Sequence, residues 1–170
     1  MCAFETFPAI VTPRLRLRGP RMDDAARLAG FAEIACAAEG LPSPPQADVR
    51  AHAEAFLGKV TQLDRKADAL FAIEDGDAGL VGMIGFHEDR PRRPEVGYWV
   101  ARPFRGRGYA AEAVEAALVW AHESWGRRAV WAGHAPGDEA AARTLVNAGF
   151  LYTGDLDLRP SPTRMMVWLA

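Results

Sequence analysis

The sequence predicts a single α/β domain with a mixed, mostly antiparallel central sheet of about seven strands and helices on both faces. The first observation is length, because 170 residues can bury one substantial core but are too few for two. The second is composition, since 49% hydrophobic and 25% charged residues is an ordinary globular balance. The third is the order of elements: strands and two helices come first, then a strand–helix–strand–helix unit, then two final strands.

The N-terminal part predicts one short strand and two helices. Apolar and basic residues alternate over Leu15–Arg18, which is typical of a strand. Asp23 and Asp24 are residue types that cap helices, so a helix is expected from there to about Ala38. A glycine and three prolines then separate it from a second helix at about Ala47–Val60. The inward faces are expected to carry Leu28, Phe31 and Ala35 in the first helix and Ala53, Phe56, Leu57 and Val60 in the second.

Three further strands are predicted in the middle of the chain. Leu70–Ile73 and Leu80–Phe86 are apolar runs separated by the turn sequence Glu-Asp-Gly-Asp-Ala-Gly at residues 74–79. A charged, proline-bearing loop leads to the third strand, Glu95–Ala101. Short connections favour antiparallel neighbours, so the three strands should form a meander.

A helix is predicted after the glycine-rich segment, because small or apolar residues recur with a helical period at positions 110, 113, 114, 117, 118 and 121. This helix should cross over to a strand at Arg128–Ala132, which is then expected to lie parallel to Glu95–Ala101. A last helix, Glu139–Asn147, is followed by a glycine, which is a typical helix end. Two terminal strands are expected near Phe150–Gly154 and Met165–Leu169.

Charge and cysteine content exclude several classes of protein. The formal net charge is −2 at pH 7, so nucleic acid is not expected as a partner. Two cysteines, Cys2 and Cys36, suggest neither a disulfide framework nor a metal site. No apolar run approaches the ~18 residues of a membrane span and no leader sequence opens the chain, so neither membrane nor metal is expected and a cytoplasmic location is the default.

The most informative motif is the loop Arg105-Gly106-Arg107-Gly108-Tyr109-Ala110, between a predicted strand and a predicted helix. Two glycines let the backbone approach a ligand closely. The free N–H groups at the start of the helix point at one spot, where the helix dipole favours negative charge. Two arginines flank that spot. The loop therefore predicts a seat for a phosphate-bearing cofactor.

Two known phosphate-binding motifs fit this loop less well. The spacing Gly106-x-Gly108-x-x-Ala111 fits a dinucleotide-binding fingerprint, which should close the first strand of a βαβ unit with an acidic residue about 20 positions later. Here earlier strands precede the motif, and the next strand ends in Gly133-His134. A P-loop would need Gly-Lys-Ser/Thr, which is absent. A loop that only turns a strand into a helix remains an alternative.

The chain resembles the GNAT acyltransferases over nearly its whole length. The glycine loop fits the Q/R-x-x-G-x-G/A signature of that superfamily. Three other segments resemble the branch that acetylates ribosomal-protein N-termini: Thr12–Arg18 its first strand, Glu95–Val100 its fourth strand, and Ala148-Gly149-Phe150 the close of its last helix. The resemblance implies a GNAT-like fold in which the fourth and fifth strands splay apart around the cofactor, with one such domain at 1–170.

The resemblance implies acetyl-CoA as the co-substrate and assigns residues to it. The backbone of Gly106, Arg107, Gly108, Tyr109 and Ala110 should hold the pyrophosphate, with the Arg105 and Arg107 side chains nearby. The backbone of Trp99 and Val100 should pair with the pantetheine and thioester. Asp138 lies where relatives carry an asparagine, and it is expected either to cap the last helix or to touch pantetheine.

Three residues are candidates for a catalytic role. Glu95, at the start of the fourth strand, is the preferred general base, and His87, at the end of the preceding strand, is the second. Relatives carry a serine where this chain has Ala141, which cannot donate a proton. His134 should face the gap between the splayed strands, where it could contact the acceptor or supply that proton. Tyr152 is a further candidate donor.

The predicted function is transfer of an acetyl group to a primary amine, either a protein N-terminus or a small molecule, by direct attack in a ternary complex. A catalytically weak acyl-CoA-binding module or sensor is the alternative, favoured by Ala141 and by the lack of a tyrosine in the last helix. The acceptor groove is expected from three segments, 38–46, 87–94 and 156–163. The middle segment is basic, which hints at an acidic acceptor, and a homodimer is possible.

Overall fold

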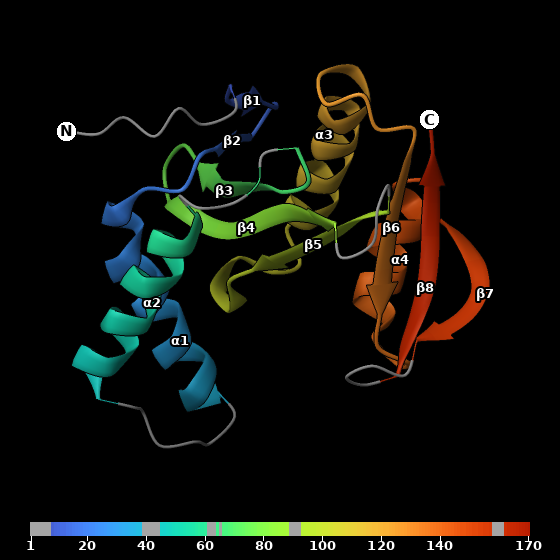
Figure 1. Cartoon of the computed structure of the whole chain (residues 1–170). Coiled ribbons are helices and arrows are strands. Elements are labelled where there is room, and N and C mark those ends of the chain that lie inside the picture. Colours follow the sequence, from blue (N-terminus) through green and yellow to red (C-terminus); the bar gives the residue numbers. More distant parts are fainter. Residues whose placement is uncertain (1–7, 39–44, 61–63, 65, 89–92, 158–161) are drawn as a thin grey trace.

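The computed structural model describes residues 8–38, 45–60, 64, 66–88, 93–157 and 162–170. Its strands form one mixed sheet of eight strands in the order β1-β2-β3-β4-β5-β6-β8-β7 (Figure 1). The strands are β1 (Ile10–Val11), β2 (Leu15–Arg18), β3 (Ala69–Asp75), β4 (Gly79–Glu88), β5 (Pro94–Val100), β6 (Ala129–His134), β7 (Leu151–Asp157) and β8 (Thr163–Leu169). The helices are α1 (Ala25–Ala38), α2 (Gln46–Val60), α3 (Tyr109–Glu123) and α4 (Glu139–Asn147), with short 3-10 turns η1 (Met22–Asp24) and η2 (Arg102–Phe104).

The predicted meander is confirmed, because β3, β4 and β5 pair antiparallel in sequence order. Every residue of β5 pairs with β4, from Pro94 opposite Glu88 to Val100 opposite Gly82. Gly82 is required in β4, since a Cβ there would lie 2.2 Å from the Trp99 carbonyl oxygen. The backbones of β4 and β5 therefore lie close together on the side of β5 away from β6.

The predicted splay between the fourth and fifth strands of the family fold is also confirmed, here between β5 and β6. The two strands are parallel, and the only register pair between them is Glu95 opposite Trp131. By contrast, β6 pairs with β8 over its whole length, from Ala129 to His134. Beyond Glu95 the edge of β5 therefore turns away from β6, and its backbone polar groups face the opening rather than another strand.

Helices cover both faces of the sheet, as predicted. Successive side chains of a strand point to opposite faces, so Met83 and Phe86 of β4 lie on different faces. Trp99, which pairs with Met83, makes an edge contact with Phe31 of α1. Phe86 instead packs against Trp120 of α3. Because both faces are covered, β4 is buried almost continuously from Leu80 to Phe86.

Three details differ from the sequence predictions. The sheet has eight strands rather than about seven, because β1 has only two residues and is too short to show an alternating pattern. Phe56 is 45% exposed rather than inward, since α2 packs on α1 and Leu57 takes the buried position. Ala35 is exposed, although it lines a cavity described below.

Asp24 lies in η1, directly before α1, and its side chain bonds to Arg18 and Arg21 rather than capping α1. Its carboxylate accepts hydrogen bonds from the backbone N–H of Arg21 and from both terminal nitrogens of the Arg18 guanidinium, at 2.7–2.9 Å. Arg18 is 6% exposed and also donates to Glu74 at 2.9 Å. These bonds compensate for burying the charges and anchor the start of α1 to the edge of the meander.

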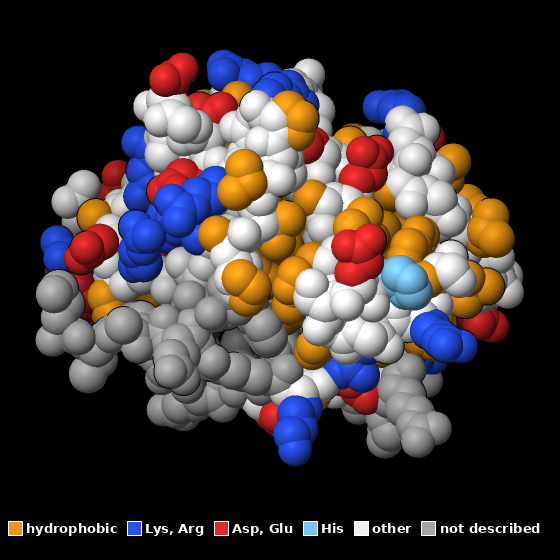
Figure 2. Space-filling view, turned by 90° about the horizontal axis from the view of Figure 1, so that it is seen from above, with side chains coloured by type: hydrophobic (Ala, Val, Ile, Leu, Met, Phe, Trp, Pro, Cys, Tyr) orange, Lys and Arg blue, Asp and Glu red, His pale blue; other side chains and the backbone are white. Residues whose placement is uncertain are grey.

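Figure 2 shows one face, on which basic and acidic side chains are interspersed and hydrophobic side chains gather near the centre.

Within the described ranges, none of the helices has the length and apolar character needed to cross a membrane.

Candidate active site

A cleft of about 740 Å³ opens where β5 and β6 diverge, between the start of α3 and α4. The predicted site residues that line it are Glu95, Trp99, Val100, Arg105, Gly106, Gly108, Tyr109, Ala110, His134 and Asp138. Arg107 and His87 are not among its lining residues. Most of the residues that sequence analysis selected therefore meet at one opening, although they come from β5, the glycine loop, α3, β6 and the start of α4.

The glycine loop has the backbone geometry that its sequence predicts. Gly106 has φ +75° and Gly108 has φ +81°, a left-handed conformation that favours glycine. Gly108 is the N-cap of α3, and no side chain caps that end of the helix. The first amides of α3 are therefore left open beside the cleft, where they can bind an anion together with the helix dipole.

The two loop arginines have different environments. Arg105 lines the cleft and donates from Nε to the Val100 carbonyl at 2.9 Å, which ties the loop to the end of β5. The Arg107 guanidinium lies 5.6 Å above the ring of Phe104, outside the cleft lining. Its backbone carbonyl accepts a hydrogen bond from Arg14 at 2.8 Å.

Tyr109 lines the cleft, and its side chain is anchored to β3. The residue is 9% exposed, and its hydroxyl donates to Asp75 Oδ2 at 2.7 Å. This hydrogen bond raises the pKa of the Tyr109 phenol. The pKa of the Asp75 carboxyl is lowered, first by the backbone N–H of Ala78 and then by Tyr109.

Glu95 lies at the apex of the splay, because it forms the single register pair with β6. His87 pairs with Glu95 across β4 and β5, but its Nδ1 lies 2.6 Å from Asp68 Oδ1 and its side chain is 74% exposed. Of the two candidate bases, Glu95 is thus the one that borders the cleft.

His134 ends β6 at the cleft and is 6% exposed. Its Nδ1 lies 2.9 Å from the Ala135 carbonyl, which can only accept, so Nδ1 carries the proton. Its Nε2 lies 2.9 Å from the Tyr152 hydroxyl, which donates to it when the imidazole is neutral. The two candidate donors from the sequence are therefore a hydrogen-bonded pair on β6 and β7.

Asp138 caps α4, which was one of its two predicted roles. Its Oδ1 accepts from the backbone N–H of Ala141 at 3.0 Å. A side chain therefore caps the start of α4, whereas no side chain caps the start of α3. This contrast singles out α3 as the helix end that is open to an anionic ligand.

Tyr98 is a cleft residue that sequence analysis missed. No hydrogen bond of good geometry reaches its buried hydroxyl from the described residues, and the nearby Thr144 hydroxyl donates instead to the Ala140 carbonyl at 3.0 Å. Burial raises the pKa of Tyr98, the Thr144 hydroxyl opposes this, and the Asp138 charge adds to it. The sequence could have revealed Tyr98 as a buried residue, because it alternates with Val96 and Val100 and these three side chains share one face of β5.

A second cavity of about 300 Å³ lies on the α1 side of β5, lined by Leu28, Phe31, Ala32, Ala35, Trp99, Ala101, Arg102 and Arg105. Trp99 and Arg105 border both cavities. The segments predicted to form the acceptor groove fall largely on residues 39–44, 89–92 and 158–161, which lie outside the described residues.

An open mixed sheet whose parallel strands diverge beside an uncapped, glycine-led helix defines the GNAT class of acyltransferase folds. The family model described as "Acetyltransferase (GNAT) domain" matches residues 14–151, and the chain belongs to this family.

Individual relatives resemble the chain at lower identity. Over 80 residues it is 32% identical to YdaF of Bacillus subtilis, provisionally named a ribosomal N-acetyltransferase; the match covers 46% of this chain and 44% of that protein, less than half the relative's length. The ribosomal-protein-S5-alanine acetyltransferase of Vibrio fischeri superposes with a TM-score of 0.78 at 16% identity, over 96% of this chain and 97% of that one. RimJ of Mycobacterium smegmatis, solved in complex with CoA-disulfide, superposes with a TM-score of 0.75 at 21% identity, over 92% and 82%.

Proposed function

We propose that the protein is an acetyl-CoA-dependent N-acetyltransferase that acts on the α-amine of a protein N-terminus. One observation carries the proposal: the uncapped start of α3, with two left-handed glycines, opens on the cleft where β5 leaves β6. That arrangement suits the diphosphate of CoA, whose pantetheine arm would then run along the free edge of β5. The RimJ structure with CoA-disulfide and the names of the ribosomal acetyltransferases support the choice of ligand and acceptor.

The proposed reaction is direct. A neutral amine attacks the thioester carbonyl, the C–S bond breaks, the amine loses one proton, and the CoA thiolate gains one. Glu95 borders the cleft at the apex of the splay and is the proposed proton acceptor, directly or through one water. Acetyl-CoA supplies the acyl group. The protein holds the two substrates in position, supplies the base, and encloses the reaction in a cleft that limits water.

An α-amine is the favoured acceptor because it needs little help to become neutral. With a pKa near 7.8, it costs about 1 kcal/mol to deprotonate at pH 7, whereas a lysine near 10.4 costs about 4.6 kcal/mol. A single carboxylate at the cleft edge is adequate for the first amine but weak for the second. The proposed acceptor is therefore the N-terminus of a ribosomal protein rather than a lysine side chain.

His134 and Tyr152 are proposed to contact the acceptor. His134 lines the β6 side of the cleft and is hydrogen-bonded to Tyr152 behind it, and Ala141 offers no hydroxyl. A thiol pKa near 8.5 makes CoA a fair leaving group at neutral pH, so a dedicated acid is not required.

The test is an acceptor screen with purified protein, acetyl-CoA and peptides that carry ribosomal-protein N-termini. Release of free thiol together with peptide acetylation at the α-amine is the expected result. If the protein binds CoA but releases no thiol with any amine, the result favours the alternative, an acyl-CoA-binding module. This alternative is tested because Ala141 has no hydroxyl that could donate a proton.

A further inference from the structure

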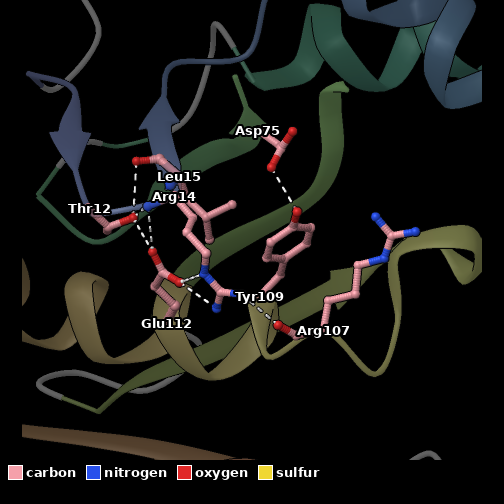
Figure 3. Close-up of polar contacts among 7 residues, drawn as sticks. All are labelled: Thr12, Arg14, Leu15, Asp75, Arg107, Tyr109 and Glu112. Carbon is pink, nitrogen blue, oxygen red and sulfur yellow. Dashed lines mark hydrogen bonds and ion pairs between the residues drawn. The ribbon is translucent and has the colours of Figure 1, made fainter. Parts of the chain in front are cut away.

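A segment far away in sequence contacts the glycine loop and the first turn of α3 (Figure 3). Thr12 and Arg14 precede β2, and both reach Glu112 in the first turn of α3. The Thr12 hydroxyl donates to Glu112 Oε1 at 2.6 Å across 100 residues of sequence. Arg14 donates to the same carboxylate from its backbone N–H at 3.0 Å, from Nε at 2.7 Å and from Nη2 at 2.6 Å.

The guanidinium of Arg14 also fixes one peptide plane of the loop. Its Nη1 donates to the Arg107 carbonyl at 2.8 Å. In a trans peptide the carbonyl and the following N–H point in opposite directions. Holding the Arg107 carbonyl toward Arg14 therefore turns the N–H of Gly108 away from Arg14, and Gly108 borders the cleft whereas Arg14 does not.

A second contact fixes the next residue. Tyr109 lies under the Arg14 guanidinium, 5.1 Å from it, and its hydroxyl is bound by Asp75 of β3. Figure 3 shows the Arg14 and Asp75 contacts reaching the start of α3 from separate segments. Both ends of the peptide unit that follows Gly108 are thus constrained before any ligand binds.

Thr12, Arg14 and Glu112 do not line the cleft, so their effect on a ligand would pass through the loop. Glu112 is informative because its charge has the wrong sign for direct anion binding. A carboxylate in the first turn of α3 repels a bound diphosphate, and removing that charge alone should strengthen binding. If Glu112 acts by holding Arg14, removing it should weaken binding instead.

We propose that Arg14, held by Glu112, is a positioning residue that aims the backbone amides of Gly108 and Tyr109 at the CoA diphosphate. The inference rests on the proposed use of CoA. It adds residues outside the signature loop to the binding site, and it gives a role to the five contacts that Thr12 and Arg14 make with Glu112 and the Arg107 carbonyl.

The test compares CoA with pantetheine, which lacks the diphosphate. Binding of both is measured for the wild type, Arg14→Gln, Arg14→Lys and Glu112→Gln, by calorimetry for CoA and by thermal shift for pantetheine. Arg16→Gln is the matched control, because Arg16 is an exposed arginine of β2 whose side chain makes no hydrogen bond or ion pair with the described part of the chain. Unfolding midpoints without ligand confirm that each variant is folded.

The expected result is a loss of CoA affinity of roughly tenfold to a hundredfold for both Arg14 variants, with pantetheine binding unchanged. Lysine keeps the charge but cannot bridge Glu112 and the Arg107 carbonyl together. Glu112→Gln should also weaken CoA binding, and Arg16→Gln should not.

Three outcomes overturn the inference alone: CoA affinity unchanged in the Arg14 variants, equal losses for CoA and pantetheine, or tighter CoA binding by Glu112→Gln. Failure of the wild type to bind CoA is a distinct outcome, and it overturns the proposed function with the inference.

Discussion

Replacing Gly108 by alanine tests the proposed cofactor site most directly. Gly108 has φ +81°, and an added Cβ would lie 3.3 Å from Nη2 of Arg14. A left-handed conformation costs an L-residue roughly 1–2 kcal/mol. In a domain of this size that free energy corresponds to a fall in Tm of about 2–8 °C. The variant should therefore remain folded at ordinary temperatures.

The expected effect on cofactor binding is larger than the effect on stability. To relieve the strain, residue 108 must rotate or Arg14 must move, and either change redirects the loop amides. Loss of one hydrogen bond to a charged phosphate oxygen costs roughly 1.5–3 kcal/mol, which is about tenfold to a hundredfold in affinity. The assay is calorimetric titration with CoA, with thermal unfolding of each protein measured in parallel.

Gly126→Ala provides the control. Gly126 also has a left-handed φ, +70°, a Cβ there would meet nothing within 4 Å, and the residue does not line the cleft. It should show a similar loss of stability with normal CoA affinity. If Gly108→Ala binds CoA within twofold of the wild type while Tm falls as expected, the loop is not the diphosphate seat.

The remaining predictions concern catalysis, the acceptor, the cleft and acid stability. Glu95→Gln should lower kcat by roughly 10² or more with CoA binding intact, and a near-normal rate across pH 6–9 would remove Glu95 from the mechanism. His134→Ala should raise the acceptor KM more than it lowers kcat; a large fall in kcat at constant KM would make the histidine catalytic instead. Tyr98→Phe removes a buried hydroxyl that lacks a good partner, so thermal unfolding should show an unchanged or higher Tm, with less stabilisation by added CoA if the ligand normally completes that bond. Burial opposes ionisation of Glu112, but hydrogen bonds from Thr12 and Arg14 outweigh it and lower its pKa. Its ionised form therefore stabilises the fold above its unfolded pKa of about 4.3, and this stability is lost as pH falls through the lower folded pKa. Glu112→Gln should accordingly flatten the acid side of the curve of Tm against pH, and an unchanged curve would contradict the assignment.

The elements that the sequence predicted are those whose signals are local. The bounds of β2 and α4 agree with the predicted Leu15–Arg18 and Glu139–Asn147, because strand alternation and helix caps are written in adjacent residues. The glycine loop was predictable for the same reason, since Gly106 and Gly108 supply positive φ where the chain turns into α3. Helical period and turn residues act over a few positions, so one sequence is enough to reveal them.

Other features required the tertiary structure. The exposure of Phe56 depends on α2 packing against α1, which no periodic pattern reveals. The pairing of His134 with Tyr152 depends on β7 lying beside β8 and β8 beside β6, an order that the chain does not follow. Both features depend on contacts between segments that are far apart in sequence, and no local sequence pattern shows that such segments meet.

By itself the sequence predicted the fold family, the glycine loop at the start of α3, and Glu95 and His134 as residues of one cleft. Only the tertiary structure decided that His87 turns to Asp68, that the Tyr98 hydroxyl is buried without a good partner, and that Arg14 bridges Glu112 and the Arg107 carbonyl. The physical reason is that local backbone preferences are set by neighbouring residues, whereas a hydrogen bond such as that between Thr12 and Glu112 exists only after the sheet brings its two ends together.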